Sequence, residues 1–289
     1  MILYKKGDNM DGILILNKEK NMTSRDVVDA VCHKLGTPKV GHTGTLDPMA
    51  TGVLVVAVNR ALKLVEDITA LDKEYIAEVT LGIKTDTYDI TGTILEEKSE
   101  HIEKDELIKV LNSFKGSYHM TVPIYSAVKV NGKKLYEYAR EGKEVELPVK
   151  DVFIKEIELI DFQDNKFSFK CSVSKGTYIR SLINDICNNL GIIGTMSNLQ
   201  RTKQGKFSIE NAVSLDDISM VKLIPMEKVI NLPIIEVDEY LYNRIKNGNK
   251  LENIYNYSKF AFFYQNKLIA IYITDPSDSK IVRPKTVFV

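Results

Sequence analysis

Hydrophobic positions along the chain follow a strand pattern in some segments and a helix pattern in others. Residues 12–16 and 53–58 are short, almost uninterrupted apolar runs, which are typical of buried strands. Between residues 166 and 173 every second residue is apolar, and this period of two predicts a strand with one buried face. Residues 178–190 carry apolar side chains at helical spacing before Gly191, which predicts an amphipathic helix that ends there.

The other elements follow from the same two periods and from turn residues. Thr23 and Ser24 are residue types that cap helix N-termini, and a helical apolar pattern follows them. Asn131-Gly132 predicts a tight turn, and residues 164–165 predict a hairpin turn. The further elements expected are a short helix at 61–66, a strand at 75–82, helices at 105–114 and 134–140, a strand at 152–162, and short strands or turns at 242–250, 260–264 and 267–273.

Changes in composition set the expected domain boundaries. Residues 1–9 are polar and irregular, so we expect a flexible N-terminal tail. Two apolar-Pro pairs, Ile224-Pro225 and Leu232-Pro233, favour a boundary near residue 230. We therefore expect a large domain at 10–229 and a module at 230–289, whose roughly 60 residues are few for an independent core.

The segment from Gly41 to Gly52 has the clearest chemical content. It contains His42 and Asp47 among glycines and threonines and leads into a buried strand. Glycines let a loop turn tightly beside a ligand, and Pro48 biases Asp47 away from helix. Asp47 is thus either a catalytic carboxylate on a shaped loop or an ordinary turn residue. A P-loop is excluded because no Gly-Lys-Ser/Thr follows the glycines at the required spacing. The dinucleotide-binding fingerprint is excluded because that motif follows a strand, whereas this loop precedes one.

A second segment, residues 174–180, joins the alternating strand to the amphipathic helix. Helix N-termini attract anions, and Lys175 and Arg180 add positive charge there. Arg180 lies beside the apolar stripe, where a partly buried guanidinium needs a carboxylate partner. Asp47 is the candidate partner, and an ordinary surface arginine is the alternative.

Composition argues against several other classes. A hydrophobic share of 44% and a charged share of 27% are those of an ordinary globular protein, and no apolar run approaches the ~20 residues that span a bilayer. We therefore expect a cytoplasmic protein without membrane association. The cysteines and histidines lack ligand spacing, so neither a disulfide framework nor a metal site is expected. Asp86 and Asp89 either partner Asp47 as in a glycosidase or cap a turn, and we favour the turn.

The net charge is zero, which gives no overall sign of nucleic-acid binding. Two local groups of basic residues nevertheless lie beside aromatic residues, a mixture that suits RNA backbone contact with base stacking. A solvated face is the alternative. The basic residues are Lys129, Lys133, Lys134, Arg140 and Lys143 around Tyr136 and Tyr138, and Arg201, Lys203 and Lys206 before Phe207.

Together these residues resemble the bacterial TruB-type tRNA pseudouridine synthases, which isomerise uridine 55 of the T-loop. The turn after Lys18 departs from the Lys-Pro-x-Gly that is usual in that family, because Glu19 and Asn21 replace the Pro and the Gly. The matching segments are Asp11-Gly12 with Asn17-Lys18, Gly41 to Gly52, Asp72 to Tyr75, Leu81-Gly82 through Thr85 to Asp89, Pro123 to Ala127 with Lys129, Gly132 to Arg140, Ser174 to Arg180, and Leu199 to Thr202.

The resemblance implies an α+β fold. A pseudouridine synthase catalytic domain would form around a bent, mixed, largely antiparallel sheet, followed by a small C-terminal PUA-like β module that binds RNA. The implied partner is the tRNA T stem-loop, with no cofactor and no metal, and we expect a monomer. A non-catalytic RNA-binding or tRNA-folding protein is the alternative, and a carbohydrate-cleaving enzyme is a more distant one.

The resemblance also implies roles for individual residues. Asp47 is the essential carboxylate, acting as nucleophile or as base on the ribose, and Arg180 keeps it ionised. Tyr75 stacks on the uracil and could assist removal of the C5 proton. The substrate-binding candidates are His42, which holds the rearranged RNA, Tyr178, which shapes the pocket, Lys18, which supports the loop or touches phosphate, and Leu199, Lys129 and Lys133.

Overall fold

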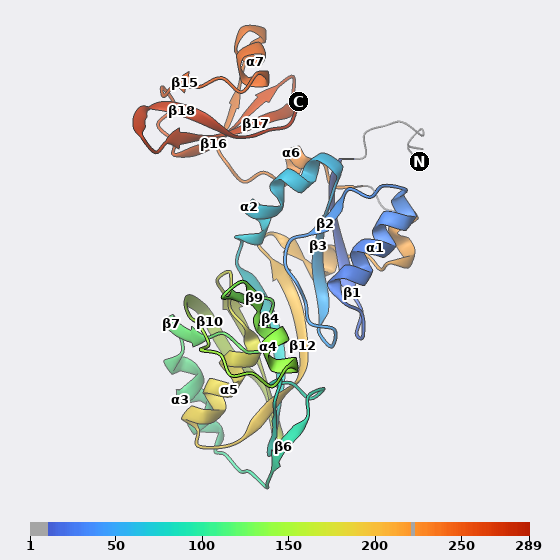
Figure 1. Ribbon diagram of the computed structural model, residues 1–289, viewed down its shortest axis with the longest axis vertical. Helices are drawn as coiled ribbons and strands as arrows, with labels where there is room; N and C mark the ends of the chain where they lie inside the picture. The colour runs from blue at the N-terminus through green and yellow to red at the C-terminus, as the bar shows by residue number, and fades with distance from the viewer. Residues whose placement is uncertain (1–10, 221–222) are drawn as a thin grey trace.

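A nine-stranded sheet lies at the centre of the computed structural model, which describes residues 11–220 and 223–289 (Figure 1). In spatial order the strands are β1 (Gly12–Lys18), β3 (Thr51–Val58), β12 (Gly194–Gln204), β4 (Lys73–Leu81), β11 (Lys166–Val173), β10 (Val149–Gln163) and β7 (Gly116–Thr121), with β2 (Val40–His42) beside β3 and β13 (Phe207–Ser208) beside β12. All pairs are antiparallel except β3–β12, which is parallel.

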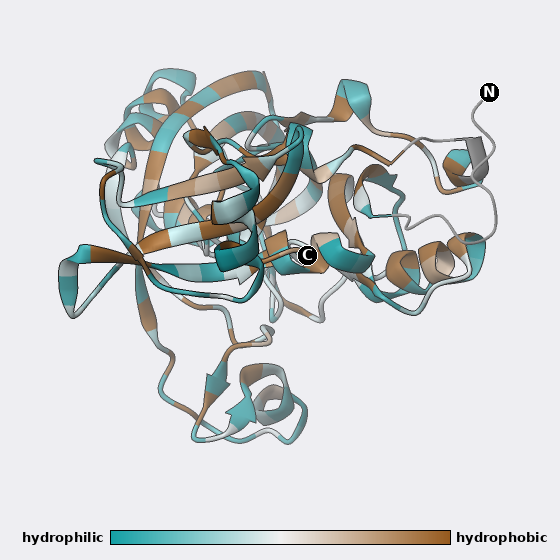
Figure 2. Cartoon of the chain, turned by 90° about the horizontal axis from the view of Figure 1, so that it is seen from above, coloured by the Kyte–Doolittle hydropathy of each residue, from teal (hydrophilic) through white to brown (hydrophobic). Residues whose placement is uncertain are grey.

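Helices cover different parts of this sheet. The α-helices are α1 (Ser24–Leu35), α2 (Val65–Thr69), α3 (Lys104–Ser113), α4 (Leu135–Arg140), α5 (Ile179–Asn189), α6 (Met226–Val229) and α7 (Glu239–Lys246). α3 and α5 share one core with β4, β11 and β10, whereas α1 packs on β1 and β3. Hydrophobic and hydrophilic bands alternate along the elements, as expected where each element buries one side (Figure 2).

The apolar run at residues 53–58 is a strand that is buried on both faces. Val53 and Val55 of β3 belong to a core shared with the C-terminal part of the chain. Leu54 and Val56 point to the opposite face and pack with α1. Two covering layers explain why this strand lacks the polar alternation of a half-exposed strand, and they confirm the prediction.

The predicted helix at 178–190 is α5, whose Leu182, Ile183 and Ile186 are fully buried against the sheet. The hairpin predicted around residues 164–165 is also present, joining β10 to β11. Asn131-Gly132 joins the short strands β8 (Lys129–Val130) and β9 (Lys133–Lys134) with positive φ angles at both residues, as a tight turn requires. These local signals therefore predict their elements correctly.

A second sheet contains the C-terminal residues and lies at the top of Figure 1. In spatial order its strands are β14 (Ile234–Glu236), β16 (Lys259–Tyr264), β17 (Lys267–Asp275), β18 (Asp278–Val287) and β15 (Leu251–Glu252). This sheet shares a hydrophobic core with the large sheet, since Phe263 and Phe288 belong to one cluster with Ile13 and Ala61. The small module thus gains apolar contacts that it could not provide alone.

The expectation of short strands or turns at 242–250 is wrong, because α7 extends to Lys246. Asp238 caps the helix by accepting a hydrogen bond from the backbone N–H of Leu241 at 2.8 Å. Ile245 anchors the helix in the core of the C-terminal sheet. The tyrosines of this segment favour a strand by propensity, but the cap and the buried anchor outweigh that weak preference.

The α+β class and the mixed, largely antiparallel sheet are confirmed by these pairings. The expected tail at 1–9 lies outside the described residues. The division near residue 230 and the PUA-like character of 230–289 stay predictions.

Gly52 lies where β3 and β12 approach most closely, and we expect Gly52→Ala to destabilise the protein strongly. Gly52 has φ +99°, and a Cβ there would lie 2.3 Å from the carbonyl oxygen of Arg201. Gly116→Ala is the control, because Gly116 has φ +104° but open space around it. In urea denaturation we expect about 1–2 kcal/mol lost at Gly116 and more than about 3 kcal/mol at Gly52. Equal losses would show that the close approach is unimportant.

Candidate active site

Asp47 lies on the loop between β2 and β3, and its carboxylate meets the guanidinium of Arg180. Arg180 Nε lies 3.0 Å from Asp47 Oδ2, and Arg180 Nη2 lies 3.5 Å from Asp47 Oδ1. The guanidinium also donates to the backbone carbonyls of Thr87 and Tyr125, each at 3.0 Å. The Arg180 side chain is 6% exposed and that of Asp47 is 36% exposed. The arginine is therefore fixed in the protein, while the carboxylate keeps access to solvent and substrate.

This ion pair borders a cavity of about 430 Å³. Its lining combines apolar and aromatic residues with one carboxylate and several cations. Residues from at least five separate regions of the chain contribute, including the loop from Gly41 to Gly52 and the segment 174–180. The lining includes Asp47, Lys73, Tyr75, Tyr136, Lys175, Tyr178, Arg180, Leu199 and Arg201. A cavity with few polar groups that converge is the usual form of a ligand site.

Buried polar groups hold the loop from below. Ser24 Oγ accepts from the N–H of Leu46 at 2.9 Å, which ties the start of α1 to the residue before Asp47. Gln204 Nε2 donates to the backbone carbonyl of Thr43 at 3.0 Å and to that of Ile68 at 3.0 Å. These bonds engage main-chain groups of the loop, and Gln204 also links the loop to α2 through Ile68. Together they hold the backbone that precedes Asp47.

Lys18 is fully buried beneath the same loop. Its Nζ donates to the backbone carbonyls of Glu19 at 2.9 Å, Met22 at 2.6 Å and Pro48 at 3.2 Å. Burial lowers the pKa of Lys18 to about 8, and Asp47 opposes that shift. All three N–H groups of the ammonium are engaged, so this placement favours loop support over phosphate contact as the role of Lys18.

The prediction that Arg201 belongs to an exposed basic group before Phe207 is wrong. The side chain of Arg201 is 1% exposed, and its guanidinium donates to the carbonyls of Val53 at 2.7 Å and Gly44 at 3.1 Å. A register shift in β12 between Arg201 and Lys203 turns Lys203 to the other face, where its side chain is half-exposed. Arg201 therefore supports the glycine loop instead of presenting charge on the surface. Sequence alone carries no signal for this role, because its partners are main-chain carbonyls.

We expect Arg201→Met to lower the free energy of unfolding by about 2–4 kcal/mol, since the buried carbonyl of Val53 and the partly buried carbonyl of Gly44 lose their donor. Lys203→Met is the matched control on the same strand, and it should change stability by less than about 0.5 kcal/mol. Thermal unfolding followed by circular dichroism measures both. A loss at Arg201 no greater than at Lys203 would contradict the supporting role.

Tyr75 and Leu199 form the floor of the cavity. Tyr75 of β4 is 8% exposed and Leu199 of β12 is 5% exposed. Tyr178 precedes α5, and burial raises the pKa of its phenol, which therefore stays protonated at neutral pH. These side chains provide an apolar, aromatic surface of the kind on which a planar base can stack.

His42 lies at the start of the loop and is not among the residues that line the cavity. The backbone N–H of Gly44 lies 3.3 Å from His42 Nδ1 and donates to it. Burial lowers the pKa of His42, and the charge of Arg201 adds to the effect. A neutral imidazole at neutral pH fits the expectation that His42 positions RNA and does not transfer protons; that role stays a prediction.

Asp86 and Asp89 are engaged in their own turn. Asp89 Oδ1 accepts from the N–H of Thr91 at 2.9 Å, and Asp86 Oδ1 accepts from the N–H of Thr93 at 2.8 Å. The hydroxyl of Tyr125 occupies the second oxygen of Asp86 at 2.8 Å. These contacts favour the turn-capping interpretation over a second catalytic carboxylate.

The basic residues around α4 lie at the edge of the cavity. Tyr136 lines the cavity, and Lys134 and Arg140 lie 5.4 and 5.3 Å from its ring centre. Lys133 lies 4.9 Å from the ring of Tyr138 and forms an ion pair with Glu141. Lys129 is exposed on β8. The predicted pairing of cations with tyrosines is therefore present, and the RNA contacts of Lys129 and Lys133 stay predictions.

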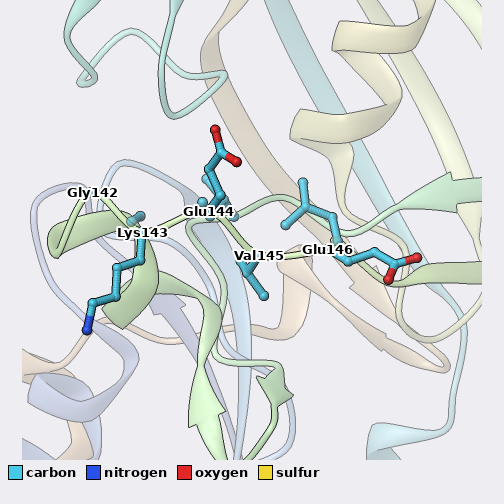
Figure 3. Close-up of a pocket in the computed structure, with 8 residues that line it drawn as sticks. Gly142, Lys143, Glu144, Val145 and Glu146 are labelled. Atoms are coloured by element: carbon cyan, nitrogen blue, oxygen red, sulfur yellow. The ribbon is translucent and has the colours of Figure 1, made fainter.

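A second hollow, of about 630 Å³, lies beside the end of α4; Lys143 of the predicted basic group lines it, but none of the predicted catalytic residues does. Figure 3 shows that the side chains of Lys143, Glu144 and Glu146 there point in different directions. A ligand site requires polar groups that converge, so this hollow is a weaker candidate than the cavity at Asp47.

Among the described residues there is no group of three or more His, Cys, Asp or Glu side chains placed to hold a metal ion. In the same part of the chain, no helix is both long and apolar enough to cross a membrane.

Comparison with known proteins gives two family matches. Residues 33–179 match the N-terminal domain of the TruB family pseudouridylate synthases, a match that spans more than half of the 289 residues. The chain belongs to the TruB family. Residues 180–241 match the C-terminal domain of tRNA pseudouridylate synthase B. The boundary between the two matches lies at the start of α5, directly before Arg180.

Individual TruB relatives match over nearly the whole chain. The tRNA pseudouridine synthase B of Caldanaerobacter subterraneus subsp. tengcongensis is 44% identical over 285 residues, covering 97% of this chain and 100% of the relative. That of Caldicellulosiruptor saccharolyticus is 45% identical over 262 residues, covering 89% and 91%. A chain in the crystal structure of a Cbf5-Nop10-Gar1 complex is 25% identical with a TM-score of 0.74, covering 97% of this chain and 85% of that one. The likeness therefore extends over both sheets.

Proposed function

We propose that this TruB-family chain is a tRNA pseudouridine synthase that isomerises uridine 55 of the T-loop. The observation that carries the proposal is the Asp47 carboxylate paired with the buried Arg180 guanidinium beside a cavity floored by Tyr75. The matched relatives named tRNA pseudouridine synthase B support the tRNA substrate. A cytoplasmic monomer that uses no cofactor is part of this proposal.

The reaction breaks the N-glycosidic bond of uridine, turns the uracil and joins its C5 to C1′ of the ribose. The target base must first leave the stacked loop, at a cost of a few kcal/mol. Tyr75 and Leu199 then provide the surface that receives the flipped base. Asp47 acts on the ribose as nucleophile or as base, and Arg180 orients its carboxylate through two contacts.

Binding of the remaining tRNA would involve two further regions. The cation–tyrosine pairs around α4 lie next to the cavity, where the T-stem would continue from the flipped base. The module at 230–289 adds a stacked pair, Tyr242 and Tyr264, with Lys246 5.9 Å from the ring of Tyr242. Such contacts depend on phosphate charge, so we expect affinity to fall as salt rises.

The test is to incubate the purified chain with tRNA that carries no modified nucleosides. Pseudouridines are then mapped by treating the RNA with a reagent that marks them and sequencing it. We expect one new pseudouridine, at position 55. A non-catalytic RNA-binding or tRNA-folding protein would bind the tRNA tightly and leave every uridine unchanged, and that result would contradict the proposal.

A further inference from the structure

Lys73 is a buried cation that lines the cavity and has no role in the mechanism proposed above. It lies at the start of β4, two residues before Tyr75, so the period of the strand places both side chains on one face. Both line the cavity, and each residue is 8% exposed. Lys73 therefore lies where a base resting on Tyr75 would be within reach of its ammonium.

Among the residues that the structure describes, no carboxylate forms an ion pair with the ammonium of Lys73. Its Nζ donates to the backbone carbonyls of Thr69 and Leu71, each at 2.5 Å, and to no other described residue. The adjacent carboxylate of Asp72 pairs instead with Lys155 at 2.5 Å. One N–H of the ammonium is thus uncommitted, in contrast to Lys18, whose three N–H groups all have acceptors.

The other cations of the cavity are either engaged or exposed. Arg180 is paired with Asp47, and Arg201 is bonded to two carbonyls. Lys175 is exposed at the rim. Burial, together with Arg201 and Lys175, lowers the pKa of Lys73 to about 8, while Asp72 opposes that shift. Burial and repulsion by neighbouring cations destabilise this ammonium, so an anion that forms beside it interacts with it strongly and favourably.

Isomerisation generates such an anion. When the C1′–N1 bond breaks, both of its electrons leave with the uracil, whether Asp47 attacks C1′ or removes the proton from C2′. The negative charge spreads over N1 and the two carbonyl oxygens of the uracil. The detached base stays in the cavity until C5 attacks the sugar carbon and loses its proton. A preorganised cation aimed at that charge lowers the barrier to cleavage.

We infer that Lys73 is a catalytic residue that donates a hydrogen bond to a carbonyl oxygen of the departing uracil and stabilises its negative charge. No proton is transferred in this step, and the ammonium keeps its bonds to Thr69 and Leu71. The inference rests on the proposed function, because it concerns the leaving group of that reaction.

Two other roles predict different behaviour. A phosphate contact would place Lys73 on the RNA backbone, but the exposed Lys175 is better placed for a hydrated phosphate than a residue that is 8% exposed. A purely structural role would use Lys73 only to cap the end of α2 through its two carbonyl bonds. If Lys73 contacted phosphate, its removal would weaken tRNA binding. If its role were purely structural, its removal would lower stability and would reduce the rate equally on every substrate.

The test compares two tRNAs, one with uridine and one with 5-fluorouridine at the target position. Fluorine withdraws electrons and stabilises the uracil anion, so the better leaving group needs less help from the protein. Single-turnover rates are read by chromatography of the nucleosides after nuclease digestion, because C5 of the fluorinated base has no proton to release. The variants are Lys73→Met, Lys73→Arg and the control Lys166→Met, which removes a half-exposed lysine at the far end of the sheet.

For Lys73→Met we expect a rate loss of about 10²–10³-fold with uridine, a loss below about 10-fold with 5-fluorouridine, and a change in tRNA Kd below about 3-fold. Lys73→Arg should recover part of the rate, and Lys166→Met should match wild type. Equal losses on both tRNAs, or a loss confined to Kd, would overturn the inference. Wild type that leaves uridine unchanged would instead refute the proposed function.

Discussion

Asp47→Asn is expected to keep tRNA binding and to lose isomerisation by at least about 10³-fold. Asn has nearly the same shape, but it can neither attack the sugar carbon nor take a proton from it. The carboxylate is 36% exposed on a loop that Ser24, Lys18 and Gln204 hold in place, and the Asn oxygen can still accept a hydrogen bond from Arg180, so we expect the variant to fold. Single-turnover pseudouridine formation measures the rate, and filter binding measures the Kd.

Asp29→Asn is the matched control, because Asp29 is an exposed carboxylate of α1 that pairs with the exposed Arg25. It should retain the wild-type rate and Kd. A rate for Asp47→Asn within about 10-fold of wild type would remove Asp47 from the chemistry. A large rise in Kd without a change in rate would make it a binding residue instead.

Arg180→Lys is expected to reduce the single-turnover rate by about 10²-fold while changing tRNA Kd by less than about 3-fold. The guanidinium makes two contacts with Asp47 and two with the carbonyls of Thr87 and Tyr125. An ammonium cannot span all four, so the carboxylate loses its orientation although the positive charge remains. The contrast between rate and Kd separates this effect from a general loss of RNA binding.

The control for this substitution is Arg25→Lys, which makes the same exchange at an exposed arginine of α1. Thermal unfolding of both variants shows whether Arg180→Lys stays folded. An unchanged rate would mean that the bidentate geometry is unimportant. A loss that appears only in Kd would assign Arg180 to substrate binding.

Much of the architecture could be predicted from local patterns. The stripe of α5, the alternation of β11 and the Asn131-Gly132 turn each specify one element, because period and turn chemistry act over a few residues. Such signals are contained within short segments of the chain. The pairing of Asp47 with Arg180 is different, because the two residues are far apart in the sequence; the residues alone leave a surface arginine as the alternative, and the family resemblance favours the pair.

What could not be predicted depends on contacts between distant segments. Arg201 looks like a surface cation in the sequence, and only the fold brings it under the carbonyls of Gly44 and Val53. Ser24 gives a correct helix signal, but its bond to Leu46 is invisible without the loop beside it. Lys73 lies in the matching segment Asp72 to Tyr75, but the role that we infer for it depends on its burial and on its backbone contacts, which only the fold shows.

The central claim is that Asp47 acts on a uridine that has turned into the cavity. Release of tritium from tRNA labelled at C5 of uridine tests it most directly, because that hydrogen is lost only when C5 becomes bonded to the sugar. We expect wild type to release one tritium per fully labelled tRNA, and Asp47→Asn to release none above background. Release by Asp47→Asn at a rate close to wild type, or no release by wild type, would contradict the account.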